Sequence, residues 1–580
     1  AGILSAADVH VARRLGVIGG ETDDAVLLAA ALVVRSTRHG SVVLDLATAA
    51  ERTSRDVDDD SEAPTTDVPL DWPDDWEPRV AASSLVGDGA PLRMAGSRVW
   101  LARYWDQEKQ VARELRERVA SQPDDLDLDV LNAGLDRLFA AGKDDDQREA
   151  ARICALSPVS VLAGGPGTGK TTTVSRLLAL LREQHPELRI ALAAPTGKAA
   201  ARLEEAVRSS AATLPAADRN RLGELSATTL HRLLGWRPEA RSRFRHDRTN
   251  RLPVEVVVVD EASMVSLTLM ARLLEALRPA TRLVLVGDPD QLASVEAGAV
   301  LADLVDRAET SRRTASVAVA PLRTNRRFAA SSGIARLAAA VQEGRGDDVL
   351  AVLRSAGSPE VELVEVDDEA SLSTGQLDAV REDVVGSGAA LREAARSGDV
   401  VAALEALDRH RLLCAHRRGP RGVQHWSALA DRWVADAHPV DVRADGRYAG
   451  EPLLVTANDY DVGLYNGDTG VVVADGDGGL VAAFGRGGAP IIVPLVRLGA
   501  VRSLHSMTVH RCQGSQFERI TVLLPAAGSP LGTRETLYTA VTRATTHVRV
   551  IGSAEALVDA VARPATRATG LRERLRGELA

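Results

Sequence analysis

Residues 159–173 read VSVLAGGPGTGKTTT, a short apolar run followed by glycines, a lysine and three threonines. The octet GGPGTGKT (164–171) fits the pattern GxxxxGK[ST], and it stands between an expected strand (159–163) and an expected helix (172–182), the context this motif requires. Glycines let successive backbone N–H groups turn toward a polyphosphate at a helix N-terminus, where the helix dipole also favours anions. A Gly-rich turn that fits the pattern by chance is the weaker interpretation.

This loop predicts a site for ATP and Mg²⁺. Lys170 is expected to contact the β- and γ-phosphates, and the Thr171 hydroxyl is expected to bind Mg²⁺. The residues expected to hold the nucleotide are Gly164, Gly165, Pro166, Gly167, Thr168, Gly169, Lys170, Thr171 and Thr172.

Two later strand ends carry polar residues that suit the same chemistry. In VVVVDEAS (256–263), Asp260 is suited to hold Mg²⁺ and Glu261 to polarise an attacking water. An acidic pair at a strand end often only caps a helix, but its position after the phosphate loop favours the catalytic interpretation. In LVGDPDQL (285–292), Gln291 can sense the γ-phosphate, and a purely structural turn is an equal alternative.

The spacing of apolar runs predicts an α/β fold. Between residues 159 and 288, apolar runs recur, each followed by a turn and a helical stretch, as expected for a parallel sheet covered on both faces. A second strand-rich region follows between residues 411 and 524 and predicts a second sheet. Within it, the Gly-rich stretch 466–497 predicts a small β-barrel inserted into an α/β domain. The first 120 residues mix strands and helices, and the acidic segment 51–77 is expected to be a solvated loop.

Length and composition limit the class of protein. A chain of 580 residues is expected to form about three to six domains. No apolar run approaches the roughly 20 residues that span a bilayer, and residues 1–15 lack the pattern of a secretion signal, so a cytoplasmic protein without membrane contact is expected. The three cysteines, Cys154, Cys414 and Cys512, are too far apart in sequence for a local metal motif.

Charge is unevenly distributed along the chain. The net charge is −10, but residues 51–77 hold eleven acids against two arginines, a net of −9, so the remainder is nearly neutral. Residues 236–251 hold six arginines against two acids. A basic groove for nucleic acid is therefore permitted by the composition, although it is not demonstrated.

An ordered series of blocks carries a family resemblance. The blocks span about 400 residues and read DDQREAARIC (145–154), GGPGTGKTTT (164–173), APTGKAAARL (194–203), ATTLHRLLGW (227–236), VVVVDEASMV (256–265), LVGDPDQLASVEAG (285–298), LRTNRRF (322–328), NDYDVGLYNGDTG (458–470), MTVHRCQGSQF (507–517) and LYTAVTRAT (537–545). Together they resemble the superfamily 1 helicases, and among them most closely the RecD subunits of RecBCD-type helicase-nucleases (exodeoxyribonuclease V).

The resemblance implies a domain plan. It predicts an N-terminal α+β partner-docking domain (1–120) and two RecA-like parallel-sheet motor domains (121–325 and 326–580). The second motor domain would hold an SH3-like β-barrel insert at about 458–502. A hairpin near 237–251 resembles the strand-separating pin of the family, and a solvated loop is the alternative.

The resemblance also implies roles for single residues. Gln147 resembles the glutamine that reads adenine, and Arg327 resembles the arginine that reaches the γ-phosphate, although Arg326 beside it leaves that choice open. Arg543 resembles the arginine of the final motif that serves the same transition state. Further residues of this kind are Gln513 at the nucleotide and Thr196, His231, Thr508 and His510 along the DNA track.

One block departs from the family pattern. Residues 510–515 read His-Arg-Cys-Gln-Gly-Ser, whereas relatives usually read His-Lys-Ser-Gln-Gly-Ser. The change at Arg511 keeps the charge, and the change at Cys512 removes a hydroxyl, which puts a serine-mediated contact in doubt.

These features together predict an ATP-dependent 5′-to-3′ DNA helicase. The resemblance implies a subunit that works with RecB-like and RecC-like chains in a heterotrimer on single-stranded DNA and duplex ends, in double-strand break repair and homologous recombination. A stand-alone RecD-like helicase and a catalytically silent scaffold are the alternatives. The chain itself is not expected to be a nuclease.

Overall fold

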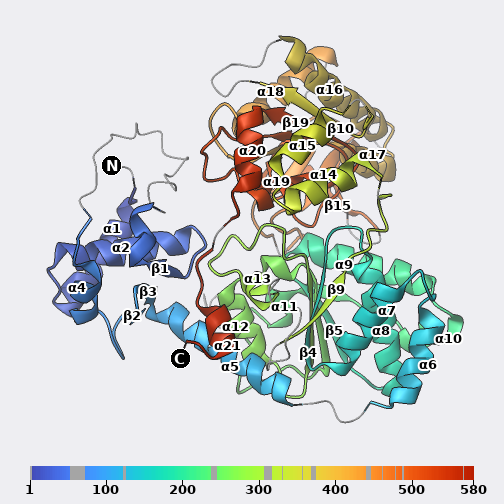
Figure 1. The fold of residues 1–580 in the computed structure, drawn as a ribbon. Coiled ribbons are helices and arrows are strands. Elements are labelled where there is room, and N and C mark those ends of the chain that lie inside the picture. Colours follow the sequence, from blue (N-terminus) through green and yellow to red (C-terminus); the bar gives the residue numbers. More distant parts are fainter. Residues whose placement is uncertain are drawn as a thin grey trace.

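The computed structural model describes residues 3–51, 72–121, 126–236, 244–305, 317–329, 331–355, 357–366, 374–438, 446–459, 461–476, 478–485, 489–565 and 567–579. Figure 1 shows an N-terminal region beside two α/β lobes. Most of the acidic segment 51–77 and part of the arginine-rich stretch 236–251 lie outside the described residues. Within the described ranges, no helix combines the length and the apolar character needed to cross a membrane.

The N-terminal region is a mixture of helices and a small antiparallel sheet, in which β3 pairs with both β1 and β2. Two of its helices, α1 and α2, pack against each other over a core of alanine, leucine and valine side chains. Its elements are α1 (Ala6–Gly19), α2 (Asp24–Arg38), β1 (Val43–Asp45), α4 (Trp76–Ala82), β2 (Leu92–Ala95), β3 (Arg98–Leu101) and α5 (Ala102–Ala120).

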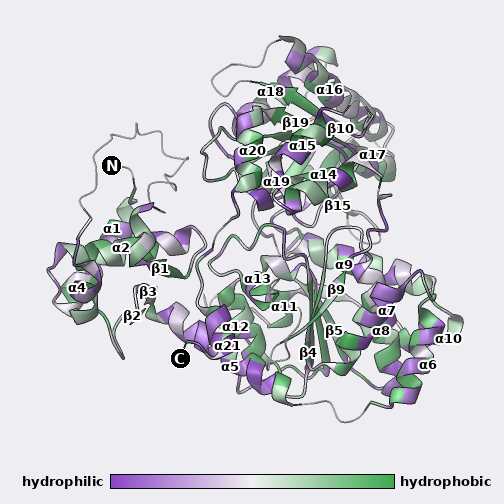
Figure 2. Ribbon diagram, in the orientation of Figure 1, coloured by the Kyte–Doolittle hydropathy of each residue, from purple (hydrophilic) through white to green (hydrophobic). Residues whose placement is uncertain are grey.

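The first α/β lobe is built on a six-stranded parallel sheet in the order β6-β5-β7-β8-β4-β9. Val257 and Val259 of β7 enter the core on one face, whereas Val256 and Val258 enter the core on the other, because successive side chains of a strand alternate between faces. This double burial explains the unbroken apolar run, and Figure 2 shows β4 and β5 in the hydrophobic colour. The lobe comprises α6 (Leu128–Leu138), α7 (Asp145–Leu156), β4 (Val159–Gly164), α8 (Lys170–Gln184), β5 (Ile190–Ala194), α9 (Gly197–Ala212), α10 (Ala216–Leu222), β6 (Ala227–Thr229), α11 (Leu230–Leu233), β7 (Val256–Val259), α12 (Leu267–Ala276), β8 (Arg282–Gly287), α13 (Val300–Leu304) and β9 (Ala318–Leu322).

The second α/β lobe repeats this plan with a five-stranded parallel sheet in the order β10-β19-β18-β11-β17. The prediction of two parallel sheets is therefore confirmed. The lobe comprises α14 (Gly333–Gln342), α15 (Gly346–Leu353), β10 (Val361–Glu365), α16 (Thr374–Arg396), α17 (Val400–Leu407), β11 (His410–Cys414), α18 (Val423–Ala437), β17 (Ser506–Thr508), β18 (Phe517–Leu523), α19 (Arg534–Val541), β19 (Ala544–Gly552) and α20 (Ala554–Ala562).

A smaller antiparallel sheet interrupts the second lobe, in the order β15-β14-β13-β12-β16. Val472 of β13 packs among other apolar side chains of this insert, whereas Val471 and Val473 pack against α16 and α17. The insert predicted from the Gly-rich hairpins is thus a sheet of β strands, and its closure into an SH3-like barrel stays a prediction. Its strands are β12 (Pro452–Val455), β13 (Thr469–Ala474), β14 (Leu480–Phe484), β15 (Ile491–Pro494) and β16 (Val501–Ser503).

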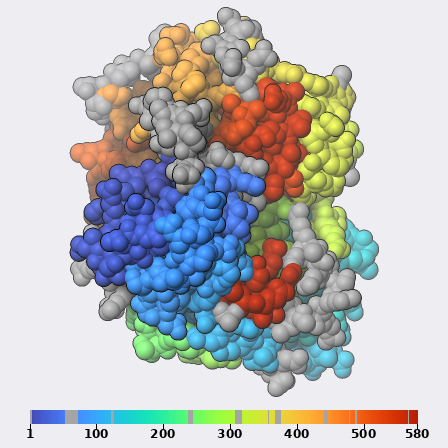
Figure 3. All heavy atoms as spheres, turned by 60° about the vertical axis from the view of Figure 1, so that its left-hand side comes forward, coloured from blue at the N-terminus to red at the C-terminus, as the bar shows by residue number. Residues whose placement is uncertain are grey.

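The end of the chain returns from the second lobe to α5 of the N-terminal region and to α13 of the first lobe. Helix α21 (Leu571–Arg576) packs on α5, and the Gly570 N–H donates to Glu108 Oε1 at 2.7 Å. The Arg574 guanidinium stacks over the Trp105 ring, 3.8 Å from its centroid. Figure 3 shows this segment as the lower red area, beside the light-blue segment that precedes the first lobe. The sequence analysis did not predict this return, which ties the second lobe to the two regions before it.

Candidate nucleotide site and DNA track

The phosphate loop lies between the carboxyl end of β4 and the start of α8. Lys170 Nζ donates to the carbonyl oxygens of Gly164 at 2.6 Å and of Gly165 at 3.1 Å. The Thr168 hydroxyl also donates to the Gly165 oxygen, at 2.9 Å. The ammonium group thus lies inside the loop, next to the helix start whose first N–H groups have no partner within the helix. This arrangement of donors and positive charge fits a polyphosphate.

Threonines occupy the next two positions of α8. Thr171 and Thr172 are half-buried, whereas Thr173 is buried and its hydroxyl donates to the Gly169 oxygen at 3.0 Å. The binding of Mg²⁺ by Thr171 and the nucleotide contact of Thr172 stay predictions.

The acidic pair follows β7. Burial raises the pKa of Asp260 to about 7; the charge of Glu261 acts in the same direction, and the charge of Lys170 opposes it. A carboxyl group held in this way gains from a nearby cation, because a divalent ion favours its ionised form. Glu261 has φ 48° and ψ 42° and is the one non-glycine residue with positive φ among the described residues. Backbone strain of this kind is typical of functional sites.

The turn after β8 contributes a buried amide. Gln291 Nε2 donates to Asp288 Oδ2 at 3.0 Å, while Gln291 Oε1 is buried and has no hydrogen-bond partner in the described part of the chain. Burial raises the pKa of Asp288, against the charge of Lys170. An orphaned buried acceptor costs free energy. The geometry thus favours a ligand-facing amide over a purely structural turn.

The second lobe reaches this site through Tyr538 of α19, which the sequence analysis missed. A Cβ atom at Gly165 would lie 2.8 Å from the Tyr538 hydroxyl oxygen, so this hydroxyl lies against the phosphate loop. The same hydroxyl hydrogen-bonds to the Asp288 side chain. Its one sequence signal was membership of the last block. A tyrosine in a buried helix does not reveal that its hydroxyl contacts another lobe.

Arg543 and Gln513 also come from the second lobe. Arg543 is buried, and its Nε donates to the Thr539 oxygen at 3.0 Å. Burial raises the pKa of Asp288 and the charge of Arg543 opposes this rise, which places the guanidinium within electrostatic reach of the site. Gln513 Nε2 donates to the Leu292 oxygen at 2.6 Å. This bond joins the second lobe to the turn after β8, which carries Gln291.

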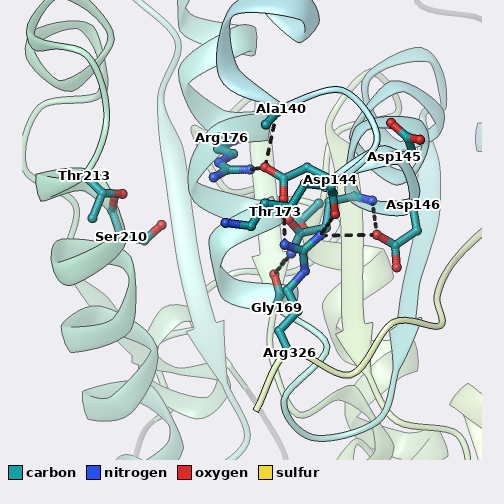
Figure 4. Close-up of polar contacts among 12 residues, drawn as sticks. Ala140, Asp144, Asp145, Asp146, Gly169, Thr173, Arg176, Ser210, Thr213 and Arg326 are labelled. Atoms are coloured by element: carbon teal, nitrogen blue, oxygen red, sulfur yellow. Dashed lines mark hydrogen bonds and ion pairs between the residues drawn. The ribbon is translucent and has the colours of Figure 1, made fainter. Parts of the chain in front are cut away.

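The two adjacent arginines behave differently. Arg326 donates to Asp144 Oδ1 at 2.6 Å, as Figure 4 shows. Arg327 Nη1 is buried and has no hydrogen-bond partner in the described ranges. Burial lowers the pKa of Arg327, and the charges of Arg543 and Arg202 lower it further. An unpaired cation beside other cations fits an anionic ligand, which favours Arg327 over Arg326 as the phosphate-contacting arginine.

Gln147 packs directly on the phosphate loop. Its Nε2 donates to the oxygens of Thr168 and Gly169, both at 3.3 Å, and the side chain is buried. Gly169 has φ 85°, a conformation that favours glycine, and a Cβ atom there would lie 2.1 Å from this Nε2. The glutamine is therefore at the site, and its reading of adenine stays a prediction.

The four residues assigned to the DNA track lie at the start of α9 (Thr196), in α11 (His231), at the end of β17 (Thr508) and in the turn that follows it (His510). Thr196 caps α9 by accepting from the Ala199 N–H at 3.2 Å, and the Thr508 hydroxyl accepts from the Arg511 N–H at 3.4 Å. Burial lowers the pKa of His231, and it lowers the pKa of His510 to about 4. The two threonines thus have local structural roles, and contact of all four residues with DNA stays a prediction.

The predicted pin lies partly outside the described residues. Residues 237–243 are not described, but Trp236 and Phe244 form an antiparallel bridge. His231 lies beside this bridge, 5.9 Å from Phe244 between ring centroids. The stretch therefore leaves and rejoins the lobe at one place, next to an expected DNA-track residue.

Two cations of α9 were also missed. Arg202 donates to the Gly514 carbonyl oxygen in the second lobe, and Lys198 Nζ donates to the Thr469 hydroxyl of the insert at 3.3 Å. Burial lowers the pKa of Lys198 to about 8. These contacts join the helix capped by Thr196 to both parts of the second lobe. Their sequence signal was only that they stand within the block APTGKAAARL.

Comparison with known proteins identifies the family. A model described as the N-terminal domain of RecBCD enzyme subunit RecD matches residues 1–100, an AAA domain matches residues 147–297, and a UvrD-like helicase C-terminal domain matches residues 503–551. RecBCD enzyme subunit RecD of Mycolicibacterium smegmatis is 52% identical over 99% of this chain and 98% of its own length. The chain belongs to the RecD family. A RecD subunit of Mycobacterium tuberculosis is 51% identical over 99% of this chain and 95% of its own, and the ATP-dependent RecD2 DNA helicase of Deinococcus radiodurans is 30% identical over 86% and 62%.

The family assignment confirms the prediction made from the ordered blocks. This RecD chain is an ATP-dependent DNA helicase with two RecA-like parallel-sheet lobes and a RecD-type N-terminal region. A site that uses nucleotide follows from the phosphate loop within the AAA match.

Proposed function

We propose that this RecD chain is the 5′-to-3′ helicase subunit of a RecBCD-type helicase-nuclease and works with RecB-like and RecC-like chains in double-strand break repair and homologous recombination. The observation that carries the proposal is that the phosphate loop of one lobe is met by the Tyr538 hydroxyl of the other. Side chains from both lobes therefore line one site, and its occupancy can control how the lobes lie.

In this proposal, Lys170 and the first N–H groups of α8 hold the β- and γ-phosphates of ATP. Thr171 and Asp260 would hold Mg²⁺, which neutralises phosphate charge and orients the oxygens when bound. Glu261 accepts a proton from the attacking water, because its carboxylate follows the strand end beside the phosphate loop.

The arginines complete the site from the other side. Arg327 and Arg543 neutralise the charge that develops on the transferred phosphoryl group, and they lose this partner after hydrolysis. The lobes then separate, and each cycle of closing and opening shifts the population between two grips on single-stranded DNA. Thr196 and His231 of the first lobe and Thr508 and His510 of the second would supply the two grips.

The test of the site is Lys170→Ala in the complex with its native partner chains. Loss of DNA-stimulated ATP hydrolysis and of this chain's 5′-to-3′ unwinding is expected, with an unchanged thermal unfolding temperature. Lys109→Ala changes an exposed lysine of α5 and serves as the matched control. Full hydrolysis by the Lys170 variant, with the activity of any second motor in the complex silenced, would refute the site.

A stand-alone helicase is the second candidate, favoured by the similarity to the RecD2 helicase. The RecD-type N-terminal match and the higher identity to RecBCD subunits favour the subunit. Purification of the tagged chain from native extract discriminates between them. Recovery of RecB-like and RecC-like chains supports the subunit, whereas a solitary chain that unwinds DNA supports the alternative. A nuclease assay on the isolated chain tests the expectation that it does not itself cut DNA.

A further inference from the structure

The segment that links the lobes is fixed on the phosphate loop by its backbone. The Arg326 N–H donates to the Gly167 oxygen at 2.8 Å, and Asn325 Nδ2 donates to the Pro166 oxygen at 3.2 Å. Asn325 Oδ1 accepts from the Arg327 N–H at 2.9 Å, which fixes the direction of the backbone where that arginine begins. A small shift of this segment would therefore move the Arg327 side chain relative to the phosphate loop.

The Arg326 side chain is held by the turn before α7 and by the first turn of that helix. Its Nη1 donates to Asp144 Oδ1 at 2.6 Å and its Nη2 to the Lys143 oxygen at 2.8 Å, while Asp146 lies 3.6 Å away. Asp146 also accepts from the Thr324 N–H at 3.1 Å. Figure 4 shows Asp144 and Asp146 meeting Arg326, with Asp145 turned away from the cluster.

Asp144 is a buried anion shared by two guanidiniums. Its side chain is 7% exposed and also accepts from Arg176 Nη1 at 2.9 Å. Burial acts to raise the pKa of this carboxyl, but the hydrogen bonds from Arg176 and Arg326 outweigh it and lower the pKa below its ordinary value. Arg176 belongs to α8, the helix that starts at the phosphate-binding lysine. One carboxylate thus joins the helix of the phosphate loop to the segment that links the lobes.

We propose that Asp144 and Arg326 form a positioning pair that holds the linking segment on the phosphate loop and thereby presents Arg327 to the γ-phosphate. This inference rests on the proposed function of the site. The pair assigns different tasks to two neighbouring arginines. Arg326 could reach a phosphate only by leaving the buried carboxylate of Asp144. The negative charge of Asp144 would then lose one of its two guanidinium partners, which is unfavourable. Arg327 Nη1, by contrast, is buried and has no hydrogen-bond partner among the residues that the structure describes.

The test compares Arg326→Gln, Arg326→Lys, Asp144→Asn and the Asp144→Asn/Arg326→Gln double variant, each in the complex with its partner chains. DNA-stimulated ATP hydrolysis gives kcat and KM, and a fluorescent ATP analogue gives Kd. We expect kcat to fall by about 10- to 100-fold in Arg326→Gln and in Asp144→Asn, because displacing a transition-state group by about 1 Å has effects of this size. Kd stays near that of the unchanged protein, because the phosphate loop itself is intact.

The remaining variants separate a positioning role from a general loss of structure. Arg326→Lys keeps a cation for the carboxylate and should retain more activity than Arg326→Gln. The double variant should be no slower than the slower single variant, since both changes break the same interaction. Asp145→Asn alters the exposed neighbouring acid and should leave kcat unchanged. Thermal unfolding identifies a variant that fails to fold. If Asp144→Asn fails to fold, the comparison of Arg326→Gln with Arg326→Lys decides whether the pair has a positioning role.

The outcomes distinguish this inference from the function on which it rests. Wild-type kcat in Arg326→Gln, or single losses that multiply in the double variant, would overturn the positioning pair. Arg327→Gln should lower kcat by more than Arg326→Gln does. A fully active Arg327→Gln would instead overturn the assignment of Arg327 to the phosphate, and with it the site proposed above.

Discussion

Gly167→Ala perturbs the contact between the phosphate loop and the segment that links the lobes. Gly167 has φ 83°, and a Cβ atom there would lie 2.6 Å from Arg327 Cβ and 2.9 Å from Asn325 Oδ1. Carbon atoms in contact lie about 3.5–4.0 Å apart, so the linking segment would have to retreat by about 1 Å. A displacement of this size can cost about 100-fold in rate, which corresponds to about 2.7 kcal/mol of activation free energy.

The same substitution also strains the backbone, and a second glycine isolates that effect. Alanine in the left-handed region costs about 1–2 kcal/mol of folding stability. Gly142 has φ 74° with no atom within 4 Å of an added Cβ, so Gly142→Ala carries the strain without the collision. Steady-state DNA-stimulated ATP hydrolysis and denaturant unfolding should show similar stability losses in both variants and a large fall in kcat only in Gly167→Ala. Equal kcat values in the two variants would refute the reasoning.

Two further predictions concern the second lobe and its contact with the first. Burial lowers the pKa of His410 to about 3, so the folded protein keeps this imidazole neutral. The unfolded chain takes up a proton there below about pH 6.5. The free energy of unfolding should therefore fall by about 1.4 kcal/mol per pH unit on acidification from pH 6.5 toward pH 3. Urea unfolding at a series of pH values should show a shallower dependence, by this one-proton slope, in His410→Asn, and an unchanged slope would contradict the assignment. Arg202→Ala removes the contact between α9 and the second lobe, so it should raise the DNA concentration needed for half-maximal ATP hydrolysis. Arg208→Ala changes an exposed residue of the same helix and should leave this concentration unchanged. Equal DNA dependence in the two variants would count against this coupling.

The central strands and the phosphate loop were predictable because each is encoded locally. The run VVVV at 256–259 can stay dry only if both faces of its strand are covered, so its composition alone indicates a parallel sheet. The phosphate loop is likewise one continuous segment, and the spacing of its glycines, lysine and threonine is what suits it to bind phosphate. These features need no knowledge of distant residues.

The contacts across the lobes were not predictable in this way. Arg326 and Arg327 are identical neighbours in the sequence. Only the fold shows that Arg326 meets a buried aspartate, whereas Arg327 Nη1 has no hydrogen-bond partner within the described ranges. Asp144 precedes a helix, where an acid is expected on helix-dipole grounds alone. Tyr538 and Arg202 stand in helices of ordinary composition, and their partners are hundreds of residues away in the chain.

The central claim is that one nucleotide site is completed by both lobes, and a structure of the complex with ADP, aluminium fluoride, Mg²⁺ and single-stranded DNA tests it most directly. The account predicts that the guanidiniums of Arg327 and Arg543 lie within hydrogen-bonding distance of the fluoride ligands that Lys170 also contacts. Arginines turned away from the filled phosphate loop, with the fluoride contacted by the first lobe alone, would contradict it.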